Sequence, residues 1–186
     1  GQHRNQFPVD VFQGGAGTST NMNMNEVIAN RGLELMGHAL GDYAHLHPND
    51  DVNQSQSTND AYPTAVRLAL LLATPRLTAA LAQLALAFQD RGTAFADIPK
   101  LGRTEMQDAV PMLLGQEMAA FAHTIREDIQ RLTEAMALIS EVNLGGTAIG
   151  TGINTAVGYR PMALTELVRL SGVPLTSASN LIEASW

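Results

Sequence analysis

The sequence predicts an all-α protein built mainly from long helices. Hydrophobic residues make up 45% of its 186 residues and aromatic residues only 5%, so the core is expected to be aliphatic. Apolar residues recur at three- and four-residue steps over residues 112–142, which is the period of one helix face. No stretch of useful length alternates between apolar and polar residues as a strand would. These observations favour a helix bundle.

The first twenty residues are expected to form a loop, because they contain Pro8 and a glycine-rich run. A helix is then predicted from about Asn23 to Leu40, with Gly41 in place to end it. Residues 41–58 are polar and contain a proline, so a second loop is expected there.

Two helices are predicted in the next part of the chain. The first begins near Asn59, with Pro63 in its first turn, where a missing N–H is tolerated. Pro75 is expected to end this helix. Thr74 also fits the N-cap of a second helix that extends to about Phe95.

The remaining chain is expected to alternate between loops and helices. Residues 97–111 contain two prolines and a glycine and are predicted to form a loop. A long helix covers 112–142 and a glycine-rich loop follows at 145–158. A short helix is predicted at 161–171, before a tail that ends at Trp186.

Composition excludes several classes of function. With 11 basic and 18 acidic residues and a net charge of -7, the chain lacks the basic surface that nucleic acid binding requires. It has no cysteine, which excludes disulfides and cysteine-ligated metals and fits a cytoplasmic location. No signal peptide is apparent at the start. The longest apolar run, Leu68 to Ala73, is too short to span a membrane, so no membrane partner is expected.

Three polar segments each lead into a helix, at residues 14–21, 52–60 and 102–108. A helix N-terminus offers free N–H groups and attracts anions, and neighbouring hydroxyls and amides can orient a carboxylate. Convergence of the three would form a pocket for a small dicarboxylate. Ordinary N-capping is the alternative for any single segment, but residues 53–60 are eight consecutive polar residues, more than capping uses.

Four segments resemble the fumarase/aspartase superfamily, in order and over essentially the whole chain. They are Gly17-Thr-Ser-Thr-Asn-Met-Asn-Met-Asn-Glu-Val27, Val52-Asn-Gln-Ser-Gln-Ser-Thr-Asn-Asp-Ala-Tyr-Pro-Thr64, Gly102-Arg-Thr-Glu-Met-Gln-Asp-Ala-Val-Pro111 and Asn143-Leu-Gly-Gly-Thr-Ala-Ile-Gly-Thr-Gly-Ile-Asn154. Within the superfamily, Gln13-Gly-Gly-Ala-Gly-Thr-Ser19 is most similar to the aspartase branch.

The resemblance implies a fumarase/aspartase-type fold of long bundled helices. Residues 1–58 would end a smaller N-terminal helical domain, and residues 59–186 would form the first part of a central helical-bundle domain. The apolar stripe on 112–142 is too long for one short chain to cover. Together with the resemblance, it predicts a homotetramer with active sites shared between subunits.

The resemblance also implies a reaction: the reversible deamination of L-aspartate to fumarate and ammonia. This is an anti-elimination through an aci-carboxylate intermediate, and it needs no cofactor and no metal. By motif match, the β-carboxylate would be bound by Thr18, Ser57 and Thr58. The residues around the amino group would be Asn59, Thr104 and Glu105.

Two features concern the related fumarases. They usually carry histidine where this chain has Glu105. In contrast, His47-Pro-Asn-Asp-Asp51 is similar to the accessory dicarboxylate site of class II fumarases, which suggests an anion site formed by His47, Asn49 and Asp50. A class II fumarase and a non-catalytic helical scaffold therefore stay open as alternatives to the ammonia-lyase.

The base of the superfamily is a serine in the pattern Gly-Ser-Ser-x-Met-Pro-x-Lys-x-Asn, which does not occur in this sequence. No catalytic residue is therefore assigned. The chain resembles a central fragment of longer proteins, and the 186 residues alone are expected to be inactive.

Three other features have simpler interpretations. His45 and His47 lie beside acidic residues, but their spacing matches no known metal site, so they are interpreted as loop residues. The glycine-rich run at 145–152 lacks a P-loop ending and is interpreted as a tight loop. Arg103 is either a substrate clamp or one half of a structural ion pair.

Overall fold

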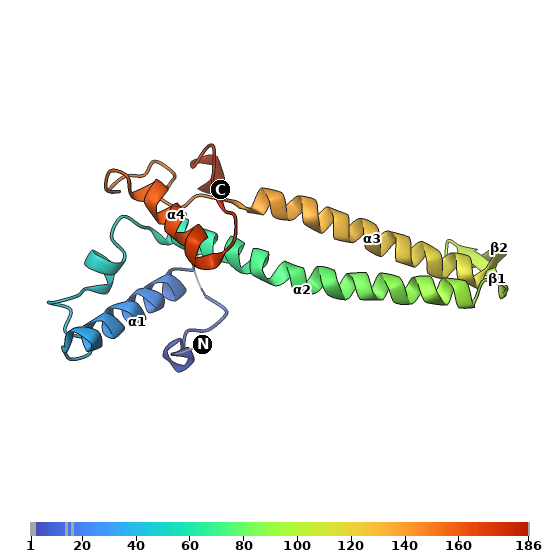
Figure 1. Cartoon of the computed structure of the whole chain (residues 1–186), viewed down its shortest axis with the longest axis horizontal. Helices are drawn as coiled ribbons and strands as arrows, with labels where there is room; N and C mark the ends of the chain where they lie inside the picture. The colour runs from blue at the N-terminus through green and yellow to red at the C-terminus, as the bar shows by residue number, and fades with distance from the viewer. Residues whose placement is uncertain (1–2, 14, 16, 186) are drawn as a thin grey trace. The chain divides into compact units, whose positions relative to one another are not determined.

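A computed structural model describes residues 3–13, 15 and 17–185 and divides the chain into two compact units. Unit 1 comprises Gly1–Ala69 and Ser140–Trp186, and unit 2 comprises Leu70–Ile139. The described residues are mostly helical (Figure 1), which confirms the predicted fold class. The start of the longest helix, at residue 58, coincides with the domain boundary expected from the sequence. The two-domain division at that point stays a prediction.

Unit 1 contains short elements and the first turns of the longest helix. Its helix α1 spans Thr18–Met36 and ends where Gly37 adopts a left-handed φ of 82°. The N–H of Gly37 then donates to the carbonyl of Glu34, and that of His38 to the carbonyl of Leu33. The other elements are η1 (Arg4–Gln6), the π-helix η2 (Pro48–Val52), the start of α2 (Thr58–Ala94), β3 (Glu141–Val142), α4 (Tyr159–Ser171), β4 (Thr176–Ser177) and η3 (Glu183–Ser185).

The core of unit 1 is small and combines apolar with polar residues. Strands β3 and β4 pair in parallel, with Val142 opposite Ser177. The buried apolar residues are Ala29, Leu33, Val142, Leu175 and Ala178, and the buried polar residues are Asn25, Asp60, Thr64, Asn143 and Thr147. Three of these polar side chains, those of Asn25, Asp60 and Asn143, hydrogen-bond to other segments and so help to position the loops of this unit.

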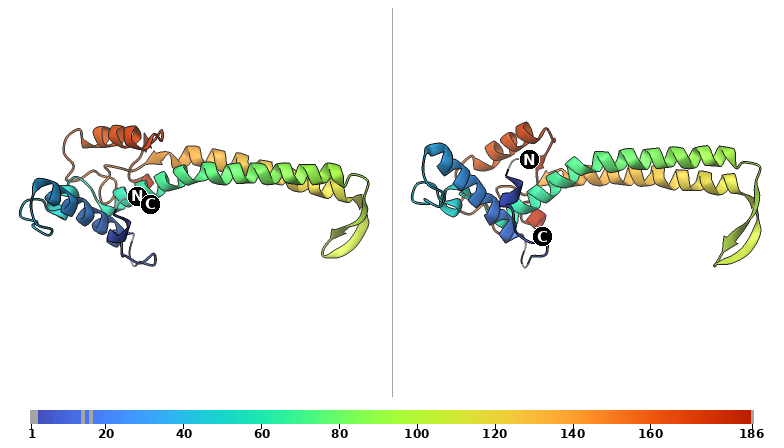
Figure 2. Two further views of the ribbon diagram at one scale, coloured as in Figure 1. Left: turned by 60° about the horizontal axis from the view of Figure 1, so that its bottom comes forward. Right: turned by 90° about the horizontal axis from the view of Figure 1, so that it is seen from below.

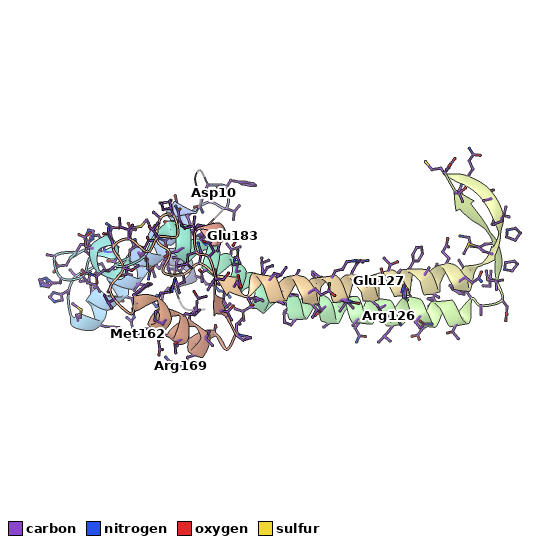
Figure 3. The ribbon with its side chains drawn as sticks, turned by 90° about the horizontal axis from the view of Figure 1, so that it is seen from above. Asp10, Arg126, Glu127, Met162, Arg169 and Glu183 are labelled. Atoms are coloured by element: carbon purple, nitrogen blue, oxygen red, sulfur yellow. The ribbon has the colours of Figure 1, made fainter. Side chains whose placement is uncertain are left out.

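Unit 2 is a long antiparallel helix pair joined by a β-hairpin (Figure 2). The pair consists of α2 from Leu70 onward and α3 (Leu114–Ile139). Glycines let the two backbones approach, since a Cβ on Gly115 would lie 2.4 Å from the carbonyl oxygen of Gly92. Further along, Arg126 of α3 donates to the side chain of Gln89 on α2 at 3.3 Å (Figure 3).

The hairpin corrects the loop predicted at 97–111. It consists of β1 (Pro99–Thr104) and β2 (Gln107–Leu113), in which Thr104 pairs with Gln107. The two turn residues, Glu105 and Met106, have φ angles of 50° and 64°, as a two-residue hairpin turn requires. Neither residue is glycine, and both strands are largely exposed. The usual sequence signals of a hairpin are therefore missing.

The predicted helix break at Pro75 is also wrong, because α2 is one helix over Thr58–Ala94. Proline removes one N–H from the helix interior, which costs about 3 kcal/mol. Local hydroxyls contribute hydrogen bonds there: Thr74 Oγ1 donates to the carbonyl of Leu70, and Thr78 Oγ1 to that of Pro75. Packing along α3, where Thr74 contacts Met136, also favours the continuous helix.

Helix α2 exposes much apolar surface. An 18-residue window within it has a mean hydropathy of 1.5, so by length and composition alone it could cross a membrane. No uninterrupted apolar run in α2 is that long, because polar residues are spread through the window. A core helix of a soluble bundle passes the same test, but almost none of this window is buried within the chain. Leucines exposed on α2 are Leu70, Leu72, Leu77, Leu84 and Leu86.

Candidate functional site

The N-terminus of α2 is closed by a capping box that the second polar segment encodes. The hydroxyl of Ser57 accepts the N–H of Asn59 at 3.2 Å, and the carboxylate of Asp60 accepts the N–H of Ser57 at 2.9 Å. This reciprocal pair is typical of a Ser-x-x-acid sequence at a helix start. It fixes the backbone on which Ser57, Thr58 and Asn59 stand.

Asp60 also ties this segment to the glycine-rich loop. Its side chain is fully buried, and its second carboxylate oxygen accepts the N–H groups of Gly145 at 3.0 Å and Thr147 at 2.9 Å. The side-chain amide of Asn59 donates to the carbonyl of Ala148 at 2.8 Å. Segments more than eighty residues apart in the sequence are thereby held together. The predicted loop at 145–158 is confirmed.

The N-terminus of α1 is joined to the same place by asparagines. The side-chain amide of Asn21 donates to Thr58 Oγ1 at 3.1 Å and to Asn53 Oδ1 at 3.3 Å. Asn25, one turn further along α1, donates to the same oxygen of Asn53 at 3.0 Å. These three asparagines were not among the predicted site residues. The four-residue spacing of Asn21 and Asn25 was the available signal, since it places both on one helix face.

Thr18 is the first residue of α1, and its position is set by Gly17. Gly17 has a φ of 86°, and a Cβ there would lie 2.5 Å from the ring of Tyr62 on α2. Glycine is thus required both for its conformation and for the close approach. The cap at Gly17 offers no side-chain hydrogen bond. In the first turn of α1, Gln13 Oε1 accepts the N–H of Thr20 at 3.2 Å. Among the described residues, none accepts the N–H groups of Thr18 and Ser19, as is usual for the first positions of a helix.

These contacts bring two helix N-termini together within unit 1. Ser57 Oγ and Thr58 Oγ1 each accept an N–H from the protein, which leaves their hydroxyl protons available to donate. Hydroxyl donors beside positive helix ends are suited to a carboxylate. The structure therefore gathers Ser57, Thr58 and Asn59 at the start of α2 and joins them, through Asn21, to the N-terminal part of α1, which begins at Thr18.

Thr104 and Glu105 belong to the other unit. Both are exposed at the hairpin turn, where Glu105 adopts the left-handed conformation. Arg103 lies 3.5 Å from the carboxylate of Asp108, which is directly opposite in the strand register. This contact favours the ion-pair interpretation of Arg103 over the substrate clamp. The roles of Thr104 and Glu105 stay predictions.

The three residues of the suggested accessory site form a local cap at the start of η2. His47 Nδ1 accepts the N–H groups of Asn49 at 3.2 Å and Asp50 at 3.0 Å. The amide of Asn49 donates to the carboxylate of Asp50 at 3.2 Å. Because one nitrogen of His47 is already used, an anion there would depend on the other ring nitrogen. Anion binding at this place stays a prediction.

A family model described as Lyase matches residues 1–185. The chain belongs to this lyase family. Among curated members, the aspartate ammonia-lyase of Pseudomonas aeruginosa is 60% identical over 186 residues, which are all of this chain and 39% of that protein. This chain thus spans about two fifths of the length of the curated lyase that it matches.

Solved lyase structures confirm the fold. A Brucella melitensis protein described as fumarate lyase:delta crystallin bound to cobalt is 61% identical, with a TM-score of 0.91 over all of this chain and 40% of that one. A class II fumarase from Schistosoma mansoni is 36% identical, with a TM-score of 0.85 over 99% of this chain and 42% of that one. Both support the predicted membership of the fumarase/aspartase superfamily.

Proposed function

We propose that the complete protein containing this chain is an aspartate ammonia-lyase, which converts L-aspartate to fumarate and ammonia. The observation that carries the proposal is the pair of hydroxyls on Ser57 and Thr58 at the N-terminus of α2, each with its proton free to donate. The 60% identity to the Pseudomonas aeruginosa enzyme supports aspartate as the substrate.

In the proposed reaction, these donors act on the β-carboxylate. Removal of the neighbouring proton shifts negative charge onto that carboxylate as an aci-carboxylate forms. Hydrogen bonds from Thr18, Ser57 and Thr58 strengthen as this charge develops, which lowers the barrier. The partial positive charge at the helix N-termini also stabilises this negative charge, so no positively charged side chain has to be buried beside it. Ammonia then leaves from the adjacent carbon.

The proton must be removed by a base from outside this chain. The superfamily's serine pattern does not occur in these 186 residues, so we assign the base to the part of the protein that this chain does not cover. We accordingly propose that the isolated chain has no lyase activity. Without its base, even a well-formed carboxylate site loses most of the rate.

We further propose that the protein is a homotetramer with active sites shared between subunits. The support is the set of half-exposed leucines on two faces of α2, together with Phe121 and Leu138 exposed on α3. A helix pair with apolar residues on its outer faces needs covering in water. Neighbouring subunits would provide that cover and would bring Thr104 and Glu105 to a site formed with other chains.

The test is fumarate formation by the complete protein, followed by ultraviolet absorbance with L-aspartate and then with L-malate. Thr58→Val removes the hydroxyl while keeping the shape, and should lower kcat for aspartate by about 100-fold or more. Thr165→Val on α4, where the hydroxyl donates to the carbonyl of Pro161, is the matched control and should not change kcat.

The same assay separates the alternatives. A class II fumarase would convert malate and ignore aspartate, and a non-catalytic scaffold would convert neither. Equal activity of the Thr58→Val and wild-type proteins would contradict the proposed role of the α2 N-terminus.

A further inference from the structure

A second cluster of side chains, this one made of potential metal ligands, lies in the turn that follows α1 and is separate from the carboxylate site. It consists of His38, Asp42 and His45, and one potential ligand atom from each lies within 4.8 Å of the others. His38 Nδ1 is 3.5 Å from a carboxylate oxygen of Asp42. The rings of His38 and His45 meet edge to face, with centroids 3.8 Å apart.

The sequence placed a different pair, His45 and His47, beside acidic residues, but their spacing matches no known metal site. In the structure, His47 Nδ1 is occupied as the cap of η2. His38, seven residues before His45, takes the place beside it because the chain turns back after α1. In the part of the chain that the structure describes, no hydrogen bond engages the ring nitrogens of His45. Those nitrogens are therefore free to bind a ligand.

The turn that carries the cluster is held in shape by α1. Asn30 Oδ1 accepts the N–H of Gly41 at 2.7 Å, and Asn30 Nδ2 donates to the hydroxyl of Tyr43 at 3.2 Å. The N–H of His45 donates to the carbonyl of Asp42 at 3.0 Å. These contacts fix the backbone of all three residues. Little ordering would be needed for their side chains to close on an ion.

The distance between His38 and Asp42 fits a transition metal, and a ligand atom of His45 lies within 4.8 Å of both. Ligand atoms about 2.0–2.1 Å from a tetrahedral Zn²⁺ lie about 3.3 Å from one another, close to the 3.5 Å between His38 Nδ1 and the Asp42 carboxylate. Two imidazoles with one carboxylate are a ligand set that suits Zn²⁺ and its neighbours, and suits Mg²⁺ or Ca²⁺ poorly. The side chains are partly exposed, so an ion can reach them and water can fill the fourth position.

We propose that His38, Asp42 and His45 form a binding site for a divalent transition metal such as Zn²⁺. The bound ion links His38, just after the end of α1, to Asp42 and His45 in the following turn. The site takes no part in the lyase reaction proposed above, so its test can fail while that reaction stands.

The experiment is equilibrium dialysis of the complete protein, free of any histidine tag and stripped with a chelator, against micromolar Zn²⁺. We expect one tightly bound zinc per chain. His45→Ala and Asp42→Asn should each weaken binding at least tenfold. Because His45 is exposed, its replacement by alanine should not disturb folding. Circular dichroism of the His45→Ala protein checks this. X-ray absorption at the zinc edge should show two imidazole nitrogens and one carboxylate oxygen.

Two other histidines serve as matched controls. His123→Ala, which removes the partner of Glu127 on α3, and His47→Ala should both keep the bound zinc. Absence of stoichiometric zinc would overturn the proposal. So would zinc binding that His45→Ala leaves unchanged, or zinc that is lost equally from the His123→Ala protein.

Discussion

The side-chain amide of Asn143 donates a 3.0 Å hydrogen bond to the carbonyl oxygen of Asn59. In a regular helix, this carbonyl would accept the N–H of the residue four positions later. That residue is Pro63, which has no N–H. Because α2 begins at Thr58, Pro63 lies in its second turn and not in the first turn as predicted, so its missing N–H does remove a helical hydrogen bond. The buried Asn143, from the loop after β3, replaces that hydrogen bond.

A double-mutant cycle measures this replacement. Asn143→Ala leaves the carbonyl of Asn59 without its partner and opens a small cavity, so it should lower the free energy of unfolding by about 1–3 kcal/mol. Pro63→Ala restores an N–H that reaches the same carbonyl. In the Pro63→Ala background, Asn143→Ala should therefore cost at least 0.5 kcal/mol less, in urea unfolding of the complete protein. Strict additivity of the two changes would contradict this explanation.

The buried carboxylate of Asp60 should be a main determinant of stability in unit 1. It accepts three backbone N–H groups, from Ser57, Gly145 and Thr147. Asp60→Ala leaves all three without this acceptor, which should lower the free energy of unfolding by about 3–5 kcal/mol. Chemical denaturation with circular dichroism is the measurement.

The control for this change is Asp108→Ala. Asp108 is an exposed carboxylate whose partner, Arg103, is 3.5 Å away on the hairpin surface. An exposed ion pair of this kind contributes little, so the change should stay within about 0.5 kcal/mol. Similar losses for the Asp60 and Asp108 variants would show that burial of the Asp60 network is not what stabilises the unit.

Tyr159, the first residue of α4, should make stability depend on alkaline pH. Burial raises the pKa of its phenol, and the charge of Asp60 adds to this, while a hydrogen bond with Gln56 opposes it. The folded protein therefore holds this proton more tightly than the unfolded chain. Stability is fully present below the ordinary tyrosine pKa of about 10 and is lost as the pH rises through the higher folded pKa.

Replacing Tyr159 with phenylalanine should remove this component. The measurement is the free energy of unfolding in urea near pH 8 and near pH 10.5, a range that includes the ordinary tyrosine pKa of about 10. We expect the wild-type protein to lose more stability between the two than the Tyr159→Phe protein. Equal losses would mean that ionisation of Tyr159 is not coupled to folding.

The helices with clear periodicity could be predicted from the sequence, and the elements that depend on tertiary contacts could not. Helices α3 and α4 lie close to their predicted ranges because apolar spacing and glycine stops are local signals. The continuity of α2 through Pro75 depends on packing against α3. The hairpin depends on a turn whose two residues carry side chains despite their positive φ angles, which no composition rule reveals.

The candidate site also has a part that could be predicted from local sequence signals and a part that depends on tertiary contacts. The polar segments that hold Thr18, Ser57, Thr58 and Asn59 stand out by their density of polar residues. The residues that assemble them are Asn21, Asn25, Asn53 and Asp60, to which the sequence assigned no individual role. Their partners lie far away in the sequence, as in the 85-residue separation of Asp60 from Gly145. A single sequence gives no information about such pairs.

Glu105 is predicted to favour aspartate over malate in the complete enzyme. If the motif match holds, its carboxylate faces the amino group of the substrate, and an ammonium gains far more from it than a hydroxyl does. The alternative interpretation is that Glu105 only hydrogen-bonds its own loop. Among the residues that the structure describes, however, none hydrogen-bonds or pairs with this carboxylate. It therefore stays available at the exposed turn, held by a left-handed backbone.

The test compares Glu105→Gln and Glu105→His with the wild-type enzyme on aspartate and on malate. Loss of one charged hydrogen bond costs about 1–3 kcal/mol, so kcat/KM for aspartate should fall about 5- to 150-fold with glutamine, and more than any activity on malate. Asp108→Asn removes another exposed carboxylate of the same hairpin and should leave the ratio of the two substrates unchanged. If both Glu105 variants keep the wild-type preference, selection of the substrate amino group must come from another residue, with Asn59 and Thr104 as the next to replace.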